Sequence, residues 1–229
     1  MAFHDAGCLE ARERTTFALI KTLSWPAEKK SFCSGARAGC RRVSWEVAES
    51  DGEVELRVEI QPSHGWRTVW PRIGVRFELP DGTAPVDGAE WFGLGPLESY
   101  PDSLRAARTG RFAVGIRDLS VEYARPQETG HRTAVRRLAL TTGDSEVLRV
   151  EALPDTQGRR PGFTLSRHTP QEVARSGHPF ELPDSTSSHL TVDAAQHGLG
   201  SRACGPDVWP AFALRPEART IRLRITAPN

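Results

Sequence analysis

Several features that would point to a specific class of protein are missing from this sequence of 229 residues. No apolar run approaches the roughly 20 residues that a membrane-spanning helix needs, and residues 1–25 contain no apolar core of a signal peptide. The 30 basic and 29 acidic side chains leave a net charge of +1, so there is no basic excess to neutralise nucleic-acid phosphates or anionic lipids. We therefore expect a cytoplasmic protein that binds neither membranes nor nucleic acid.

Common catalytic and cofactor motifs are also missing. The sequence has no GxSxG, HExxH, GxGxxG or GxxxxGK[ST] motif, which are local signals of hydrolases, zinc proteases, dinucleotide sites and P-loops. The four cysteines form no CxxC pair, and the spacing of Cys33 and Cys40 does not suit a zinc site. We expect free thiols, no metal and no cofactor in this chain.

The pattern that is present is that of β-structure. Apolar and charged residues alternate without a fault from Glu53 to Gln61, which is typical of a strand with one buried face. Turn signals rich in Gly, Pro and Asp separate further strand candidates at residues 72–79, 134–141, 146–153, 162–166, 189–194 and 218–226. Only residues 169–175 suggest a helix, with Thr169 as N-cap and Pro170 in the first turn. The sequence predicts an all-β sandwich.

One segment, residues 90–112, does not fit this pattern. Its sequence, EWFGLGPLESYPDSLRAARTGRF, is too irregular for a strand and too rich in Gly and Pro for a helix. We interpret it as an ordered, irregular connection that Trp91, Phe92 and Tyr100 hold against the sandwich, because buried aromatic side chains dominate core energetics. The alternative is a sugar site, in which loop aromatics such as these and Trp209 offer an apolar wall beside polar groups.

Five segments together resemble a known family. They occur in one order and at one spacing, and they read WPRIGVRFELP, EWFGLGPLESYPDSLRAARTGRF, YARPQETGHRTAVRRLAL, FTLSRHTPQEVARSGH and HLTVDAAQHGLGSRACGPDV. They look like the C-terminal domain of the large bacterial β-galactosidases of glycoside hydrolase family 2, which some bacteria encode as a separate small chain. The resemblance implies a large two-sheet β-sandwich, a supersandwich similar in fold to galactose mutarotase, over residues 43–229.

The resemblance also implies a function and partners. In the family a (β/α)8 barrel carries both catalytic glutamates, and the length and strand pattern of this chain exclude such a barrel. We therefore assign no catalytic residue here and expect the isolated chain to be inactive. Its expected partner is a β-galactosidase catalytic chain that hydrolyses terminal β-galactosides such as lactose, in an oligomeric assembly.

The resemblance further points to one loop as the substrate-binding candidate. The family pattern Gly-x-Gly-Gly-Asp-Asp-Ser-Trp presents its Trp to the sugar cleft, and here Gly198 and Gly200 match its first glycines. Cys204 takes the serine position, Gly205 falls where the Trp belongs, and Trp209 is the next Trp along the chain. We name Cys204, Gly205 and Trp209 as candidate substrate-binding residues.

Residues 1–42 show no such resemblance and no strand period, so we expect a poorly ordered extension before a domain that starts near Val43. A shifted reading frame, a misplaced start or a truncated gene would explain it, and a disordered native extension is the alternative. Two other functions stay open for the whole chain. One is a stand-alone carbohydrate-binding module that uses Trp91, Tyr100 or Trp209. The other is an aldose 1-epimerase, whose chemistry needs a carboxylate and a histidine such as Glu128 and His131.

Overall fold

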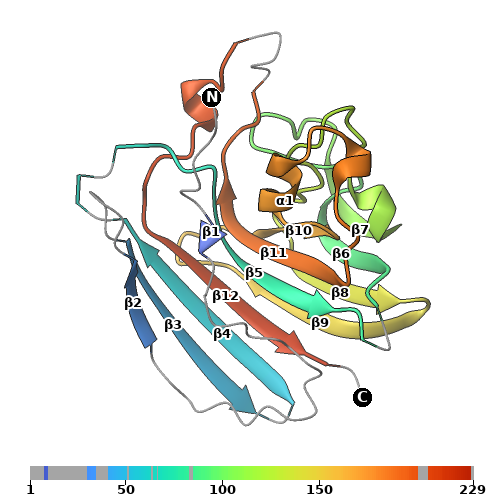
Figure 1. Cartoon of the computed structure of the whole chain (residues 1–229). Helices are drawn as coiled ribbons and strands as arrows, with labels where there is room; N and C mark the ends of the chain where they lie inside the picture. The colour runs from blue at the N-terminus through green and yellow to red at the C-terminus, as the bar shows by residue number, and fades with distance from the viewer. Residues whose placement is uncertain are drawn as a thin grey trace.

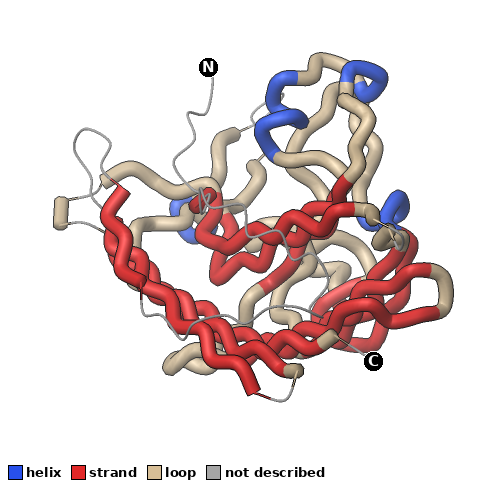
Figure 2. Tube along the Cα trace, turned by 60° about the horizontal axis from the view of Figure 1, so that its bottom comes forward, coloured by secondary structure: helices blue, strands red, loops and turns tan. Residues whose placement is uncertain are grey.

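The chain forms a two-layer β-sandwich (Figure 1). The computed structural model describes residues 8–9, 30–34, 41–50, 52–62, 64–65, 67–82, 85–200 and 206–227. Within these residues the strands form a four-stranded and an eight-stranded sheet, and the larger sheet curves around one face of the smaller one (Figure 2). The predicted all-β sandwich is confirmed by this arrangement.

The small sheet has the order β1-β5-β11-β10. Its strands are β1 (Cys8–Leu9), β5 (Arg72–Pro80), β11 (Ser187–Gln196) and β10 (Gly162–Ser166). The pairing of β1 with β5 is parallel, whereas the other strands of both sheets pair in the antiparallel direction.

The large sheet has the order β2-β3-β4-β12-β9-β8-β6-β7. Its strands are β2 (Lys30–Ser34), β3 (Arg41–Ser50), β4 (Glu53–Gln61), β12 (Arg219–Thr226), β9 (Ser145–Leu153), β8 (Arg137–Thr142), β6 (Gly88–Gly95) and β7 (Arg108–Gly115). The described helices are short: η2 (Ile116–Leu119), α1 (Pro170–Arg175), η3 (Pro179–Glu181) and η4 (Pro210–Phe212). None of the helices that the structure describes has the length and apolar character to span a bilayer.

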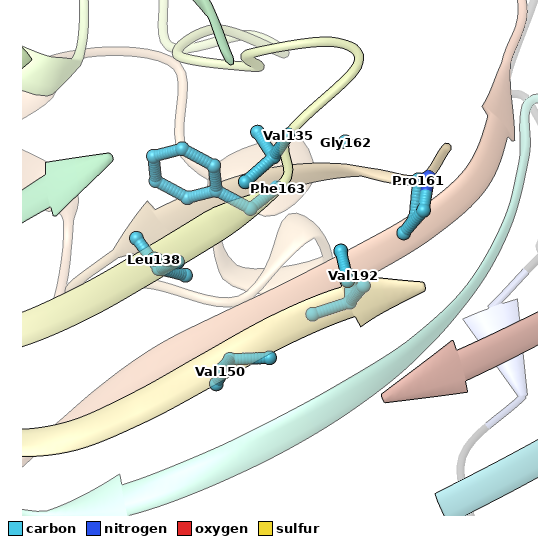
Figure 3. Close-up of a pocket in the computed structure, with 8 residues that line it drawn as sticks. Val135, Leu138, Val150, Pro161, Gly162, Phe163 and Val192 are labelled. Carbon is cyan, nitrogen blue, oxygen red and sulfur yellow. The ribbon is translucent and has the colours of Figure 1, made fainter. Parts of the chain in front are cut away.

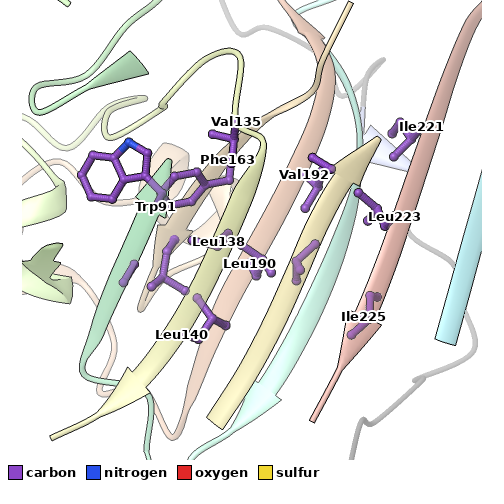
Figure 4. Close-up of a cluster of buried hydrophobic side chains, with 14 of the residues drawn as sticks. Trp91, Val135, Leu138, Leu140, Phe163, Leu190, Val192, Ile221, Leu223 and Ile225 are labelled. Atoms are coloured by element: carbon purple, nitrogen blue, oxygen red, sulfur yellow. The ribbon is translucent and has the colours of Figure 1, made fainter. Parts of the chain in front are cut away.

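The core lies between the two sheets (Figure 4). Directly opposed apolar residues cross the large sheet on its inner face, one from each of six strands: Val54, Ile225, Val150, Leu138, Trp91 and Phe112. The small sheet covers this row with Phe163, Leu165, Leu190 and Val192, which are at most 3% exposed. The ring of Phe163 meets that of Trp91 edge-on at 5.6 Å.

One small cavity remains inside the core (Figure 3). Its volume is about 10 Å³, and its walls include Val135, Leu138, Val150 and Phe163. A buried water needs at least about 10–15 Å³ and two or more polar partners. This cavity is therefore a gap in the packing and not a binding site.

The predicted strands of residues 53–61, 72–79, 146–153, 162–166 and 218–226 match observed strands to within a residue or two, so these predictions are confirmed. The short helix is confirmed as well. The Thr169 side chain accepts a hydrogen bond from the amide of Glu172, the Glu172 side chain accepts one from the amide of Thr169, and Pro170 occupies the first turn.

The prediction that residues 90–112 are too irregular for a strand is wrong. Strands β6 and β7 occupy both ends of the segment, so Trp91 and Phe92 lie in a strand and only residues 96–107 form a loop. The glycines that suggested irregularity allow close packing, because a Cβ at Gly93 would lie 2.9 Å from the Cα of Val135. A Cβ at Gly95 would lie 2.8 Å from the Trp91 ring. Trp91 and Tyr100 are buried as expected, at 3% and 0% exposed.

Strands β1 and β2 come from the segment 1–42, and they pair with β5 and β3. The division of the chain near Val43 stays a prediction.

Replacing Leu190 by Ala tests the role of the inter-sheet core. Leu190 is 1% exposed between the sheets, so we expect the truncation to lower the free energy of unfolding by about 2–5 kcal/mol. Urea unfolding of the chain measures the change. The matched control is Leu97→Ala at a side chain that is 65% exposed, for which we expect a change within about 0.5 kcal/mol. Equal losses from both variants would contradict this assignment of the core.

Candidate functional site

A group of polar side chains, most of them buried, lies at one end of the sandwich, where β5, β10 and β11 meet two loops. We call this group the polar cluster, and its members are Arg72, Tyr100, Glu128, His131, Thr164, Asp193 and Gln196. The loops that contribute to it are residues 96–107, which carry Tyr100, and residues 120–136, which carry Glu128 and His131.

The centre of the polar cluster is an ion pair between neighbouring strands. Arg72 begins β5 and donates to the carboxylate of Asp193 in β11 with both Nε and Nη2, at 3.1 and 2.5 Å. The two residues are 6% and 1% exposed. Gly74 makes room for the pair, because a Cβ there would lie 2.8 Å from the Val192 carbonyl oxygen and closer still to the Asp193 carboxylate. A bidentate contact between a guanidinium and a carboxylate is strong, and it offsets the cost of removing both charges from water.

The ion pair is joined to the surface through Glu128. Arg72 Nη1 lies 3.2 Å from Glu128 Oε2, and the Tyr100 hydroxyl donates to Glu128 Oε1 at 3.1 Å. The Glu128 side chain is 33% exposed, so it is the outermost of these three groups. Burial raises the pKa of Glu128, although Arg72 opposes this effect. Burial and the nearby Glu128 charge also raise the pKa of Tyr100, which keeps its hydroxyl protonated and able to donate.

His131 lies deeper in the polar cluster. Its Nδ1 is 3.2 Å from Thr164 Oγ1 and 3.5 Å from both Gln196 Nε2 and Asp193 Oδ2. Burial lowers the pKa of His131 to about 4, although the Asp193 charge opposes this effect. The imidazole is therefore neutral at pH 7.

This geometry limits what the polar cluster can do chemically. An epimerase mechanism needs Glu128 and His131 to reach a sugar ring together. The structure does bring both into the same cluster, because the Tyr100 hydroxyl bonds Glu128 Oε1 and also accepts from the His131 amide at 3.3 Å. However, His131 is only 2% exposed. In this structure the imidazole is therefore shielded from solvent, and the hydrogen bonds of the cluster hold the loops above it in position.

A second feature connects this end of the sandwich to the predicted substrate loop. Asp102, two residues after Tyr100, accepts from the Leu199 amide at 3.0 Å and from the Gly200 amide at 2.8 Å. We call this contact the Asp102 clamp. Gly198 permits it, because a Cβ there would lie 2.7 Å from Asp102 Oδ2. Gly200 has φ +63°, a conformation that favours glycine.

The predicted substrate-binding residues are only partly covered by the structure. Cys204 and Gly205 lie outside the described residues. Trp209 is 67% exposed just before η4, and its carbonyl oxygen accepts from the Phe212 amide at 2.8 Å. The Gly198 amide donates to the Phe212 carbonyl oxygen at 3.0 Å, so the chain on both sides of the loop is fixed. Within the described residues no group of three or more His, Cys, Asp or Glu side chains could hold a metal ion.

Sequence reasoning missed the polar cluster, although it named Glu128 and His131 as a pair. One signal was present, because the strand sequence HLTVDAAQ carries the charged Asp193 and the polar Gln196. A charge that folding buries requires a partner, but the sequence does not show that the partner is Arg72, 121 residues away.

By fold and site, the chain is a β-sandwich domain with loops held in place at one end. Comparison with protein families identifies it further. A family model described as "Beta galactosidase small chain" matches residues 12–226, and the chain belongs to this family. The match begins within the segment 1–42, which we expected to lie outside the family.

Curated relatives agree with the family. A β-galactosidase of Arthrobacter sp. (strain B7) is 59% identical over 184 residues, which are 80% of this chain and 18% of that protein. The β-galactosidases of Halalkalibacterium halodurans and Aeromonas hydrophila are 32% and 33% identical over 70% and 74% of the chain. In both cases the matched part is 15% of the relative's length, so the chain spans less than a fifth of these relatives.

A solved structure from Escherichia coli K12, provisionally assigned as an aldose 1-epimerase, is similar over 86% of this chain and 64% of its own. Its TM-score is 0.42 and its sequence identity 9%. A similarity of this size does not decide the fold, which rests here on the strand pairing.

The low pKa of His131 predicts a pH-dependent stability. The imidazole has a pKa of about 4 in the folded chain and 6.5 as its ordinary value, so the unfolded chain binds a proton first as pH falls. We expect the free energy of unfolding to fall by up to about 3 kcal/mol between pH 6.5 and pH 4 through this group. Urea unfolding at several pH values measures the slope. His131→Gln removes this part of the slope and the exposed His178→Gln leaves it unchanged; identical slopes for all three proteins would contradict the prediction.

The Asp102 clamp predicts the exchange behaviour of two amides. Replacing Asp102 by Ala removes both acceptors, and a hydrogen bond to a charged group contributes about 1.5–3 kcal/mol. We expect hydrogen exchange at Leu199 and Gly200 to speed up at least about tenfold, as measured by NMR. Asp102→Asn keeps one acceptor oxygen and should retain part of the protection. The control is Asp184→Ala, at an exposed carboxylate of another loop. Unchanged exchange in Asp102→Ala would rule out the clamp.

Proposed function

We propose that this chain is the C-terminal β-sandwich part of a β-galactosidase, either a small subunit or the residual part of a split gene. It acts beside a catalytic chain whose (β/α)8 barrel carries the catalytic glutamates, and it completes the cleft for terminal β-galactosides such as lactose. The observation that supports this most is the 59% identity to a stretch that makes up 18% of the Arthrobacter β-galactosidase.

The acids of the polar cluster are consistent with a non-catalytic role. Glycoside hydrolysis needs two carboxyl groups on either side of an open cleft, about 5–9.5 Å apart. Asp193 is 1% exposed and paired with Arg72. Glu128 accepts a hydrogen bond on each of its two oxygens. Both carboxylates are thus engaged by groups of the chain itself, and the proposed contribution of the chain is positional: it narrows the cleft and orients the substrate.

The exposed apolar side chains suit a surface that a partner covers. The loops joined by the Asp102 clamp and the following η4, at the upper end of Figure 1, carry Leu97, Leu104, Leu199, Trp209 and Phe212. Their exposures range from 36% to 67%. Exposed apolar side chains that gather in one patch typically mark an interaction site. We propose that these loops face the catalytic chain, with Trp209 as the aromatic side chain nearest the sugar. An oligomeric assembly, a cytoplasmic location and the lack of a cofactor remain predictions.

Complementation tests the proposal. The catalytic partner is the Arthrobacter β-galactosidase truncated to remove the 184-residue match, and the substrate is o-nitrophenyl β-galactoside. We expect neither protein alone to be active and the mixture to recover turnover. Trp209→Ala should raise KM or abolish recovery, while Phe180→Ala, a matched exposed aromatic that is 83% exposed, should recover activity as well as the unmodified chain.

The possible outcomes separate the competing functions. Robust turnover by the isolated chain would overturn the proposed role, as would a failure of the two chains to associate. A saturable change in tryptophan fluorescence when lactose is added to the isolated chain, without any complementation, would instead favour a stand-alone carbohydrate-binding module.

A further inference from the structure

The face of the large sheet that points away from the core carries a hollow of about 450 Å³. Its walls come from β6, β7, β8 and β9 and from Arg136 and Arg160 beside them. Side chains alternate along a strand. Trp91, Leu138 and Val150 point into the core, so the residues before and after each of them point to the outer face. The volume lies within the roughly 300–1,000 Å³ that small-molecule sites occupy.

A row of directly opposed residues crosses this outer face, and most of its charges are compensated. From β4 to β7 the row reads Glu55, Arg224, Glu151, Arg137, Phe92 and Arg111. Arg224 lies 2.9 Å from Glu55 and 3.4 Å from Glu151, and Arg137 lies 3.5 Å from the other oxygen of Glu151. Each arginine of this part of the row therefore has a carboxylate beside it.

This pairing of charges stops at Phe92, within the hollow. Among the described residues, no carboxylate lies within ion-pair distance of Arg111, Arg136 or Arg160. Arg160 donates to the Ala152 carbonyl oxygen at 2.5 Å, a contact that leaves its charge uncompensated. Five arginines and three glutamates line the hollow, which leaves it with two net positive charges.

One arginine of the hollow, Arg136, is positioned before any ligand arrives. The guanidinium carbon of Arg136 lies 5.5 Å from the centroid of the Phe92 ring, and Arg111 is directly opposite Phe92 on β7. The backbone at Arg136 is fixed from both sides, because its amide donates to Phe92 and its carbonyl accepts from Ala152. A guanidinium fork suits phosphate oxygens, and because Arg136 is already positioned, its side chain loses less freedom on binding.

We propose that this hollow binds a phosphate monoester of about monosaccharide size. The phosphate lies against Arg111 and Arg136. Its charge of about −1.5 to −2 at pH 7 matches the net positive charge of the residues that line the hollow. The remainder of the ligand fills the rest of the hollow over β8 and β9. The site does not include the polar cluster or the Asp102 clamp, so it can exist whether or not the chain completes a galactosidase cleft.

Isothermal titration of the full chain tests the proposal, with galactose 6-phosphate, galactose and inorganic phosphate as probes at low salt and pH 7.5. We expect saturable binding of the sugar phosphate, no binding of galactose, and weaker binding of inorganic phosphate. The double variant Arg111→Gln/Arg136→Gln loses the charge-assisted hydrogen bonds, so its affinity for the sugar phosphate should fall at least about tenfold. Both residues are exposed, so the variant is expected to keep its fold, which thermal unfolding verifies.

The control is Arg57→Gln, which removes one positive charge, half the change of the double variant, at an exposed position of the same sheet outside the hollow. It should leave the affinity unchanged. No binding of galactose 6-phosphate, an unchanged affinity in the double variant, or an equal loss in Arg57→Gln would each overturn the site. Inorganic phosphate that binds as tightly as the sugar phosphate would overturn the assignment to a monoester.

Discussion

The end of the sandwich that carries the candidate site depends on one buried ion pair. Arg72 and Asp193 link neighbouring strands of the small sheet, and through Glu128 and Tyr100 the same guanidinium reaches both loops above them. A buried pair of this kind is sensitive to change, because removing one partner leaves an uncompensated charge and costs about 3–5 kcal/mol. The pair therefore ties the position of the loops to the integrity of the sheet, which is what a domain needs if it is to present loops to another chain in a fixed orientation.

The large sheet meets two different demands with two adjacent rows of residues. The inner row, from Val54 to Phe112, packs against the small sheet, and the outer row, from Glu55 to Arg111, meets solvent with mostly alternating charges. Exposed ion pairs of this kind contribute little to stability individually, about 0–1 kcal/mol. The position at which the ion pairs end is more informative, because the arginines that lack a carboxylate partner line the hollow.

Much of the fold could be predicted from the sequence, because strict alternation in segments such as Glu53–Gln61 reports a strand with one buried face directly. The strands β6 and β7 were missed because their glycines were interpreted as turn signals, whereas close approach of Val135 and of the Trp91 ring requires them. The family resemblance pointed to Trp209, and the structure shows it exposed. The polar cluster could not be predicted, since Arg72 and Asp193 are brought together only by the pairing of β5 with β11. Pairing between distant strands is a property of the whole fold and leaves no local trace.

The position of Arg111 on β7 has a further consequence for the behaviour of the chain in solution. Among the strands that the structure describes, β7 lies at the end of the large sheet and pairs only with β6, so its other side offers backbone groups to an extended segment that approaches. Arg108 and Arg111 place positive charge along this strand, and both side chains are exposed. Charged residues on an edge strand disfavour edge-to-edge addition of further strands. By this rule, the arginine beside the hollow also disfavours edge-to-edge pairing of two folded chains.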